Sequence, residues 1–358
     1  MLEWYGATSE VSWLFLLAAW VLALIAACAV YSMWNRAGLG MRLTVHQISP
    51  APDSPAAELP ELLMRSGPYP APIFEGDGIA LEIALTTSGG SRGPAWLKGD
   101  VAGTELARAT GIVPRRGWSQ LETFEKVRRG PLGASGWILG SSDPLGLFQS
   151  RRGCLDVELG LVLPRFSTLA AARDMRELEA SVAAPRAGSG NEVFGVREYR
   201  PGDSLRRIHW RSSARHSQLV VREYEPPGVR TLNVYVDPSP PSREVADQIA
   251  RIAASETWEC IQDGGRVVLW APGADPSPNP RDLWSQLEWL ARYPDDRAGA
   301  FGANSPSPGD ELVIVLATPN VELLAAAEGF RQRRGWVVGD ADVEADMPLR
   351  RTGTSWPL

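Results

Sequence analysis

One stretch near the start of the chain constrains the fold more than any other: Val11 to Trp34 holds 24 residues and no charge. At about 1.5 Å per residue, a helix of this length crosses a hydrocarbon core of about 30 Å. Aromatic residues stand near both ends, as in membrane belts. The residues before it carry Glu3 and Glu10 but no Lys or Arg, unlike a cleaved signal peptide. We therefore expect a retained transmembrane helix over residues 11–34, within an anchor over residues 1–40.

The flanking charges predict the orientation of this helix. No basic residue precedes it, and Arg36 and Arg42 follow it closely. By the positive-inside rule, the chain after the helix lies in the cytoplasm. The sequence thus predicts a single-pass protein of the plasma membrane with a cytoplasmic C-terminal region.

Composition narrows the remaining classes. A chain of 358 residues has room for two or three domains of about 100–200 residues. Its net charge of −6 argues against general nucleic-acid binding, so no nucleic-acid partner is expected. Cys28, Cys154 and Cys260 form no spaced pair, and no histidine has metal-ligand spacing, so we expect neither a disulfide framework nor a zinc site.

Residues 41–165 contain short alternating runs separated by Gly and Pro, a pattern typical of a β-sandwich-like domain. Strands are expected at residues 79–85, 118–127 and 155–163. The run Asp143-Pro-Leu-Gly-Leu-Phe148 has the residues of a turn, with Leu147 and Phe148 expected to fix it to the core.

From residue 231 to residue 340 strands and helices alternate, which predicts an α/β domain with a mainly parallel sheet and helices on both faces. Strands are expected at residues 232–236, 266–270, 311–317 and 336–338, and helices at 242–262, 281–293 and 321–333. Residues 341–358 are expected to be a tail.

Residues 166–230 join these two regions. A linker helix is expected from Leu169, where good helix formers gather. The following stretch is rich in arginine, with seven between Arg197 and Arg222. It predicts a strand, a turn at Pro201-Gly202, a helix over residues 205–215 capped by Asp203 or Ser204, and a returning strand.

This arginine-rich stretch carries a resemblance. The runs Arg197-Glu-Tyr-Arg-Pro-Gly-Asp203, Arg206-Arg-Ile-His-Trp210, Ser213-Ala-Arg215 and Leu219-Val-Val-Arg-Glu223 resemble the signature of the Domain of Unknown Function 58 family. Arg128-Arg-Gly130 and the turn at Asp143 resemble further family features. Many proteins of this family have two adjacent membrane spans, whereas this chain shows one.

The resemblance implies an α+β multidomain architecture. Its expected parts are N-terminal membrane segments, a β-sandwich-like region, the signature, and a C-terminal domain resembling von Willebrand factor A. It also implies an association with MoxR-type AAA+ ATPases.

Three interpretations of the signature remain open from sequence. Its arginines pair with neighbouring carboxylates and support a fold, or they form a partner-binding surface, or they bind phosphate or nucleic acid. Arg and Trp are common at interface hot spots, which motivates the second interpretation. Its candidate binding residues are Arg197, Tyr199, Asp203, Arg206, Trp210 and Arg215.

A degenerate metal site follows the first C-terminal strand. Domains that resemble von Willebrand factor A often hold Mg²⁺ with Asp-x-Ser-x-Ser. Here Asp237 and Ser239 match, but Pro241 replaces the second serine and has no hydroxyl. One carboxylate offers too few oxygen ligands for a hard cation, so we expect no metal and no cofactor.

No sequence motif points to an enzyme. A Walker A loop and a His-Glu-x-x-His run are absent from the sequence, and the Gly-rich stretches near Gly89 and Gly188 lack the strand-before, helix-after context of a phosphate loop. We therefore expect a membrane-anchored, non-enzymatic interaction or adaptor protein that works with a MoxR-type ATPase. The alternative is a structural component of cell-envelope machinery without an ATPase partner, and a metal-dependent enzyme is the less favoured third.

Overall fold

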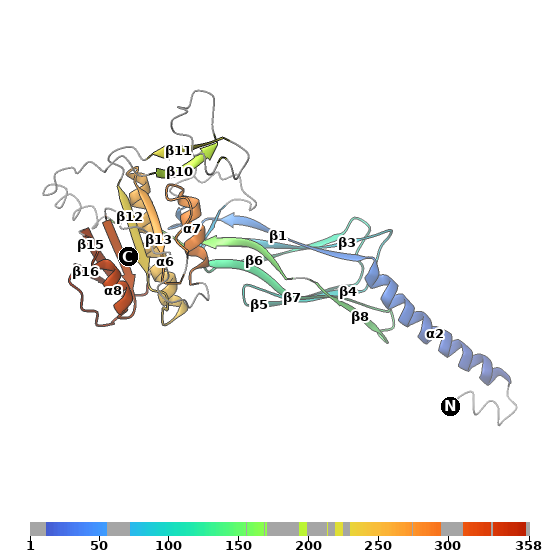
Figure 1. Cartoon of the computed structure of the whole chain (residues 1–358). Helices are drawn as coiled ribbons and strands as arrows, with labels where there is room; N and C mark the ends of the chain where they lie inside the picture. Colours follow the sequence, from blue (N-terminus) through green and yellow to red (C-terminus); the bar gives the residue numbers. More distant parts are fainter. Residues whose placement is uncertain are drawn as a thin grey trace. The chain divides into compact units, whose positions relative to one another are not determined.

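The computed structural model shows an α+β protein with an N-terminal apolar helix and several sheets (Figure 1). It describes residues 12–55, 72–154, 156–167, 169, 193–198, 213, 219–224, 230–273, 275–294, 311–330 and 332–355. The chain divides into two compact units, Met1–Leu163 and Pro164–Leu358. The finer domain boundaries expected from the sequence stay predictions.

The first unit holds two sheets. One has the order β1-β3-β6 and the other β2-β9-β7-β4-β5, with β8 paired to β7. The bounds are β1 Leu39–Ser49, β2 Ile73–Phe74, β3 Gly78–Thr87, β4 Ala95–Val101, β5 Thr104–Thr110, β6 Trp118–Phe124, β7 Gly130–Ser142, β8 Gln149–Gly153 and β9 Val157–Leu163. The strands expected near residues 79–85, 118–127 and 155–163 are confirmed as β3, β6 and β9.

A single apolar core contains side chains from both sheets of this unit. Ile79, Leu81 and Ile83 on β3 are completely buried and cluster with Leu97 of β4 and Leu139 of β7. Each fully buried side chain of this size contributes about 1.5–3 kcal/mol. The alternating runs in the sequence therefore form the two halves of one sandwich.

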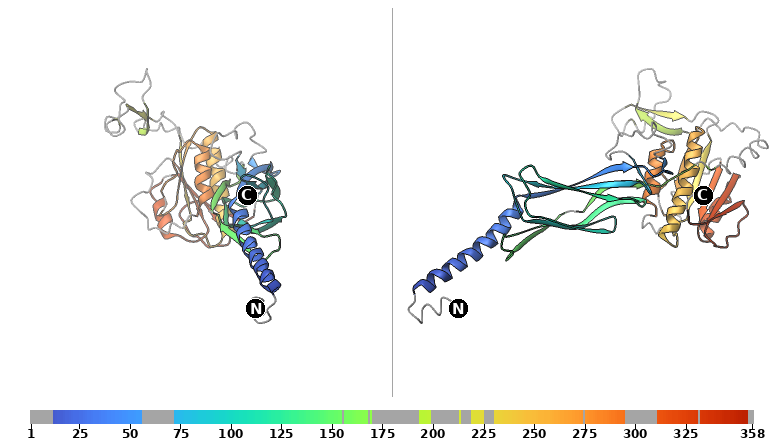
Figure 2. Two further views of the ribbon diagram at one scale, coloured as in Figure 1. Left: turned by 90° about the vertical axis from the view of Figure 1, so that its right-hand side faces the viewer. Right: turned by 180° about the vertical axis from the view of Figure 1, so that it is seen from behind.

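The N-terminal helix α2 (Ser12–Ala37) confirms the apolar helix expected over residues 11–34. From Trp13 to Ala37 it is long and apolar enough to cross a membrane, by length and composition. Its large side chains are mostly exposed, Trp20 to 75%. The helix leaves the sandwich at the end where β1 begins (Figure 2).

The C-terminal part of α2 is fixed to the sandwich by polar contacts. Asn35 is fully buried; its Nδ2 donates to Ser141 Oγ at 2.5 Å and its Oδ1 accepts from the Gly93 amide at 3.0 Å. The Tyr31 hydroxyl donates to the Gly93 carbonyl at 2.8 Å. Ser141 Oγ in turn donates to the Pro94 carbonyl at 2.8 Å. These bonds reach both β7 and the loop before β4, so the helix end and the sandwich form one body.

The turn expected after β7 is confirmed; Phe148 is half-buried, but the expected core position of Leu147 is wrong. The Asp143 carboxylate accepts hydrogen bonds from the Leu145 amide at 2.8 Å and the Phe148 amide at 2.6 Å. Burial raises the pKa of Asp143, but these bonds and one from the Cys28 thiol outweigh it, so the net pKa lies below its ordinary value. Leu147 is 57% exposed rather than buried, because the turn directs its backbone amides inward to the carboxylate.

The second unit contains a five-stranded sheet of order β13-β12-β14-β15-β16, in which every neighbouring pair is parallel. Its strands are β12 Thr231–Val236, β13 Arg266–Trp270, β14 Glu311–Leu316, β15 Gln332–Val338 and β16 Leu349–Thr352. Its helices are α6 Arg243–Gln262, α7 Leu283–Arg292 and α8 Val321–Ala327. The expected parallel sheet is confirmed.

Helices of this unit cover the sheet. The long helix α6 contacts β12, β13, β14 and β15, and α7 packs against α6. Leu323 of α8 lies in a separate apolar cluster with Tyr235, Trp270 and Phe330. Within it the Tyr235 ring lies 4.8 Å from that of Trp270, and burial raises the pKa of Tyr235 to about 12.

Two expectations for this unit differ from the structure. The helix expected over residues 321–333 ends at Ala327, because Gly329 interrupts it and β15 already begins at Gln332. The segment expected to be a tail contains β16, which extends the sheet beside β15. Arg350 and Arg351 hide this strand in the sequence, since its pattern is basic rather than apolar.

The two strands expected in the signature are present as a hairpin of β10 (Val193–Glu198) and β11 (Val220–Tyr224). They pair antiparallel, with Arg197 opposite Val221. Ser213, inside the helix expected over residues 205–215, is helical and buried. The rest of that helix, its Asp203 or Ser204 cap, and the linker helix after Leu169 lie outside the described residues.

We predict that Asn35→Ala destabilises the full-length protein in detergent by about 1–3 kcal/mol, because it leaves the buried Gly93 amide without its acceptor and removes the donor to Ser141 Oγ. Denaturant unfolding followed by tryptophan fluorescence measures this. Val30→Ala is the matched control, since Val30 lies on the same helix but is 66% exposed. Equal stability of both variants would contradict the docking role of Asn35.

Candidate functional site

The predicted signature residues lie largely outside the described part of the chain. The backbone of Arg197 belongs to β10. Tyr199, Asp203, Arg206, Trp210 and Arg215 all lie outside the described residues. The signature surface therefore stays a prediction. The structure describes how the chain is held before and after the stretch that contains it.

On either side of the stretch that contains the signature, the chain is fixed to the second unit, at α6 and at the amino end of the sheet. Before the signature, the Leu169 amide donates to Glu259 Oε1 at 2.5 Å and the Ser167 amide donates to Ser255 Oγ at 3.2 Å. The Phe166 ring lies 5.1 Å from the ring of Trp258, also on α6. These contacts fix residues 166–169 along the helix.

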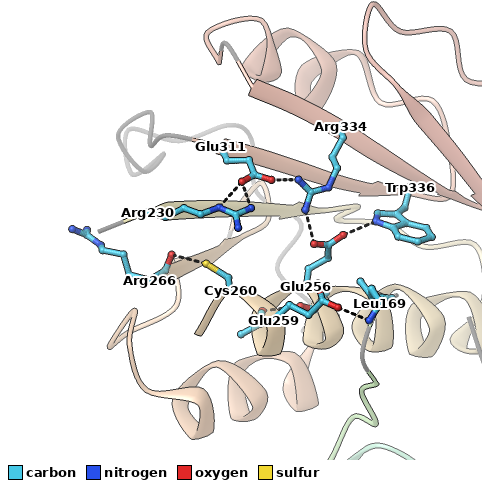
Figure 3. Close-up of polar contacts among 11 residues, drawn as sticks. Leu169, Arg230, Glu256, Glu259, Cys260, Arg266, Glu311, Arg334 and Trp336 are labelled. Atoms are coloured by element: carbon cyan, nitrogen blue, oxygen red, sulfur yellow. Dashed lines mark hydrogen bonds and ion pairs between the residues drawn. The ribbon is translucent and has the colours of Figure 1, made fainter. Parts of the chain in front are cut away.

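After the signature, Arg230 enters the sheet through a buried charge network (Figure 3). The Arg230 Nε donates to Glu311 Oε2 at 2.7 Å, at the first residue of β14. The second oxygen of Glu311 pairs with Arg334 of β15, whose guanidinium also donates to Glu256 Oε2 at 2.6 Å. Glu256 Oε1 accepts from the Trp336 indole at 2.9 Å.

This network joins α6, β14 and β15 to Arg230, the residue before β12, through two arginines and two carboxylates. The Glu256 side chain is fully buried, and the side chains of Arg334 and Glu311 are 15% and 9% exposed. Buried charges are tolerated only when they are paired and hydrogen-bonded, which is the case for each of them. The network therefore fixes the chain where it enters the sheet after the signature.

These residues were not identified from the sequence. The helix α6 was expected to have one apolar face, yet Glu256, Thr257 and Glu259 are buried as well. A signal was present in Glu311, which directly precedes a continuous apolar strand, and in the arginines at residues 333 and 334. Their pairing requires the fold.

At the opposite edge of the sheet, the Asp237 side chain is closed by protein donors. Its Oδ1 accepts from the Ser239 amide at 3.0 Å. Its Oδ2 accepts from the amides of Ala317 and Thr318 at 3.1 Å each and from the Thr318 hydroxyl at 3.0 Å. Asp237 is 1% exposed, so these four bonds use the carboxylate to tie the end of β12 to the loop after β14.

The neighbours of Asp237 fit this closed arrangement. The Tyr293 hydroxyl donates to the Asp237 backbone carbonyl at 2.5 Å. Ser239 is exposed and meets Asp237 through its backbone amide. Within the described ranges, no group of three His, Cys, Asp or Glu side chains gathers as a metal site would. The donors around the carboxylate are N–H and O–H groups, whereas a cation requires oxygen acceptors.

One segment of the chain matches a known protein family. Residues 195–278 match the family described as "Protein of unknown function DUF58". The matched segment runs from β10 past β13, and so includes β12, α6 and Arg230.

A curated relative matches over part of its length. "Uncharacterized protein YeaD" of Bacillus subtilis (strain 168) is 30% identical over 80 residues, which are 22% of this chain and 20% of the relative. The match thus spans a fifth of that protein. The DUF58 match lies over the signature, where the sequence resembles that family.

We predict that Glu256→Ala destabilises the protein by about 3–5 kcal/mol, because it leaves Arg334 and the Trp336 indole buried without their acceptor. Urea unfolding of the full-length protein in detergent measures this. As a control, Asp342→Ala removes an exposed pair with Arg351 and should cost less than about 1 kcal/mol. A similar small effect of both changes would show that the network does not stabilise the second unit.

We predict that Asp237→Ala costs about 3 kcal/mol or more, since it removes the acceptor of four hydrogen bonds. Ser239→Ala should be neutral, because its side chain is exposed. Adding about 10 mM Mg²⁺ should leave the melting temperature unchanged, whereas an ion bound to the native state would raise it. A Mg²⁺-dependent rise that Ser239→Ala abolishes would instead assign a metal site.

Proposed function

We propose that this chain is a membrane-anchored, non-enzymatic adaptor that presents its arginine-rich signature to a MoxR-type AAA+ ATPase. The observation that supports the proposal is that the chain is fixed on both sides of the stretch that contains the signature. Residues 166–169 are bonded to α6, and Arg230 is held by the buried charge network. Fixing the chain at these two points reduces its conformational freedom before binding, which favours affinity.

The hydrogen bonding at the carboxyl edge of the sheet favours a binding role over a catalytic role. Sites of parallel α/β sheets gather at this edge. Here the carboxylate at the end of β12, Asp237, accepts four hydrogen bonds from its own chain. We infer that the second unit is a domain of the von Willebrand factor A type that binds protein without a metal ion.

The anchor fits a partner on the cytoplasmic side. Arg36 lies in the last turn of α2 and Arg42 follows in β1. By the positive-inside rule we infer a single-pass protein of the plasma membrane with both units in the cytoplasm. An ATPase of the cytosol then has access to the signature.

We predict that pulldown of the detergent-solubilised full-length protein recovers an AAA+ ATPase in a nucleotide-dependent manner. The comparison is made with and without ATP and Mg²⁺, and recovered proteins are identified by mass spectrometry. Recovery of envelope proteins without an ATPase would reject the adaptor role and favour a structural component of envelope machinery.

The signature is tested within the same experiment. Arg206→Glu combined with Arg215→Glu should reduce ATPase recovery, because a specific interface of roughly 800 Å² per partner depends on a few Arg and aromatic residues. The matched control is Lys126→Glu with Arg351→Glu, which reverses two charges elsewhere. Undiminished recovery by a folded signature variant would exclude this surface.

A further inference from the structure

Exposed apolar side chains of the sandwich gather beside α2. Outside α2, the large exposed apolar residues described in the first unit are Ile112, Leu121, Leu145, Leu147 and Val157. Three of them, which we name the apolar tips, are Ile112, Leu145 and Leu147. They are exposed to 68%, 59% and 57% and lie on two turns. Both turns adjoin the C-terminal part of α2.

The first of these turns contacts α2 through Asp143. It joins β7 to β8, both of which contact the helix. The nearby Cys28 side chain of α2 contributes to lowering the pKa of Asp143. Leu145 and Leu147 follow directly on the turn that this carboxylate organises.

The second turn reaches α2 through Gly93. A Cβ placed on Gly93 would lie 2.2 Å from the carbonyl oxygen of Gly111 and 2.8 Å from the Cα of Ile112, so the two segments are in tight contact. The Gly93 carbonyl accepts the hydrogen bond from Tyr31 of α2. Ile112 is therefore held next to the helix.

The position of these contacts along α2 determines whether the two turns can reach the bilayer. Cys28 and Tyr31 precede the end of the helix at Ala37 by roughly 9–14 Å, at about 1.5 Å per residue. At that level the helix exposes Val30 to 66%, and one turn nearer its C-terminal end it exposes Met33 to 60%. A bilayer that covers these helix residues must also reach the apolar tips.

Six arginines lie on α2, on β8 or in the segments near Gly93 and Ile112, and we name them the arginine collar. They are Arg36, Arg92, Arg115, Arg116, Arg151 and Arg152. The Arg92 guanidinium lies 3.6 Å from the centre of the Trp34 ring, and Arg152 donates to the Leu39 carbonyl at 3.3 Å. Arg115 and Arg116 are exposed and follow Ile112 on its turn.

In the part of the chain that the structure describes, no ion pair to Asp or Glu includes a collar arginine. Asp143, on the turn that follows β7, is buried and bonded to its own turn. A cationic ring around apolar tips is complementary to an anionic lipid surface, where phosphates lie above acyl chains.

We propose that this end of the sandwich is a binding surface for anionic phospholipid. The apolar tips enter the boundary between headgroups and acyl chains, and the arginine collar binds lipid phosphates. Guanidinium groups suit phosphate because they offer paired donors. The inference rests on the proposed membrane anchoring by α2. It adds contacts that fix the tilt and rotation of the first unit on the bilayer.

Depth measurements in nanodiscs test the apolar tips. In full-length protein with the three native cysteines changed to serine, an environment-sensitive fluorophore is attached at Leu147→Cys, Leu121→Cys or Val21→Cys. Lipids with a quencher near the headgroup should quench the probe at residue 147 and leave the probe at residue 121 unchanged. Leu121 is the matched control because its exposure is also 57%.

The probe at residue 21 distinguishes failure of the proposed lipid surface from failure of the proposed membrane anchor. Val21 lies within α2 and is exposed, so deep quenchers should reach it if the helix spans the bilayer. Quenching at residue 21 with none at residue 147 overturns the lipid surface and leaves the anchor intact. An unquenched probe at residue 21 overturns the anchor itself.

Lipid binding tests the arginine collar. Titration of the detergent-solubilised protein with phosphatidylglycerol or phosphatidylcholine, followed by native mass spectrometry, should show preference for the anionic lipid. Arg115→Gln with Arg116→Gln should weaken phosphatidylglycerol binding by about tenfold or more. Lys98→Gln with Lys126→Gln, which removes two charges elsewhere on the unit, should have little effect. Equal weakening by both pairs, or no preference in the parent protein, would contradict the collar.

Discussion

The docking of α2 through Asn35 is the interaction on which the membrane end of the structure depends. A long apolar helix followed by a flexible linker would be only a tether. Here the buried amide of Asn35 bonds to Gly93 and Ser141, so the helix continues into the sandwich without a hinge. Because an unpaired buried amide is costly, these bonds strongly favour one position of the helix on the sandwich. That position also determines which turns lie beside the helix.

A second buried polar system has the same role in the other unit. The network of Arg230, Glu256, Glu311 and Arg334 lies where the chain leaves the signature. A buried ion pair adds little stability compared with an apolar core, but breaking it is costly. Such a network therefore fixes the chain at Arg230, shortly after the signature. The contacts of residues 166–169 with α6 fix the chain before the linker that precedes the signature. The proposed interaction role of the signature draws its support from these two fixed points.

Much of the fold follows from local sequence patterns, whereas the polar contacts do not. The uncharged run predicts α2, and the alternation of strands and helices predicts the parallel sheet, because both depend on residues close in sequence. Asn35 and Ser141 are separated by 106 residues, so their bond cannot be read from either segment. The strand β16 was missed because Arg350 and Arg351 mask its pattern. Leu147 was assigned to the core because an apolar residue in a turn usually packs inward, and its exposure is the observation behind the lipid surface.

A distance measurement across the joint between helix and sandwich tests the central claim, that α2 and the sandwich are one body. Spin labels at Met33 and Leu121, both exposed, are introduced into full-length protein without native cysteines and reconstituted in nanodiscs. Double electron–electron resonance should give a single narrow distance distribution, because the Asn35 contacts leave no hinge between the two labels. A broad distribution would mean that the helix moves independently of the sandwich, and would contradict the account.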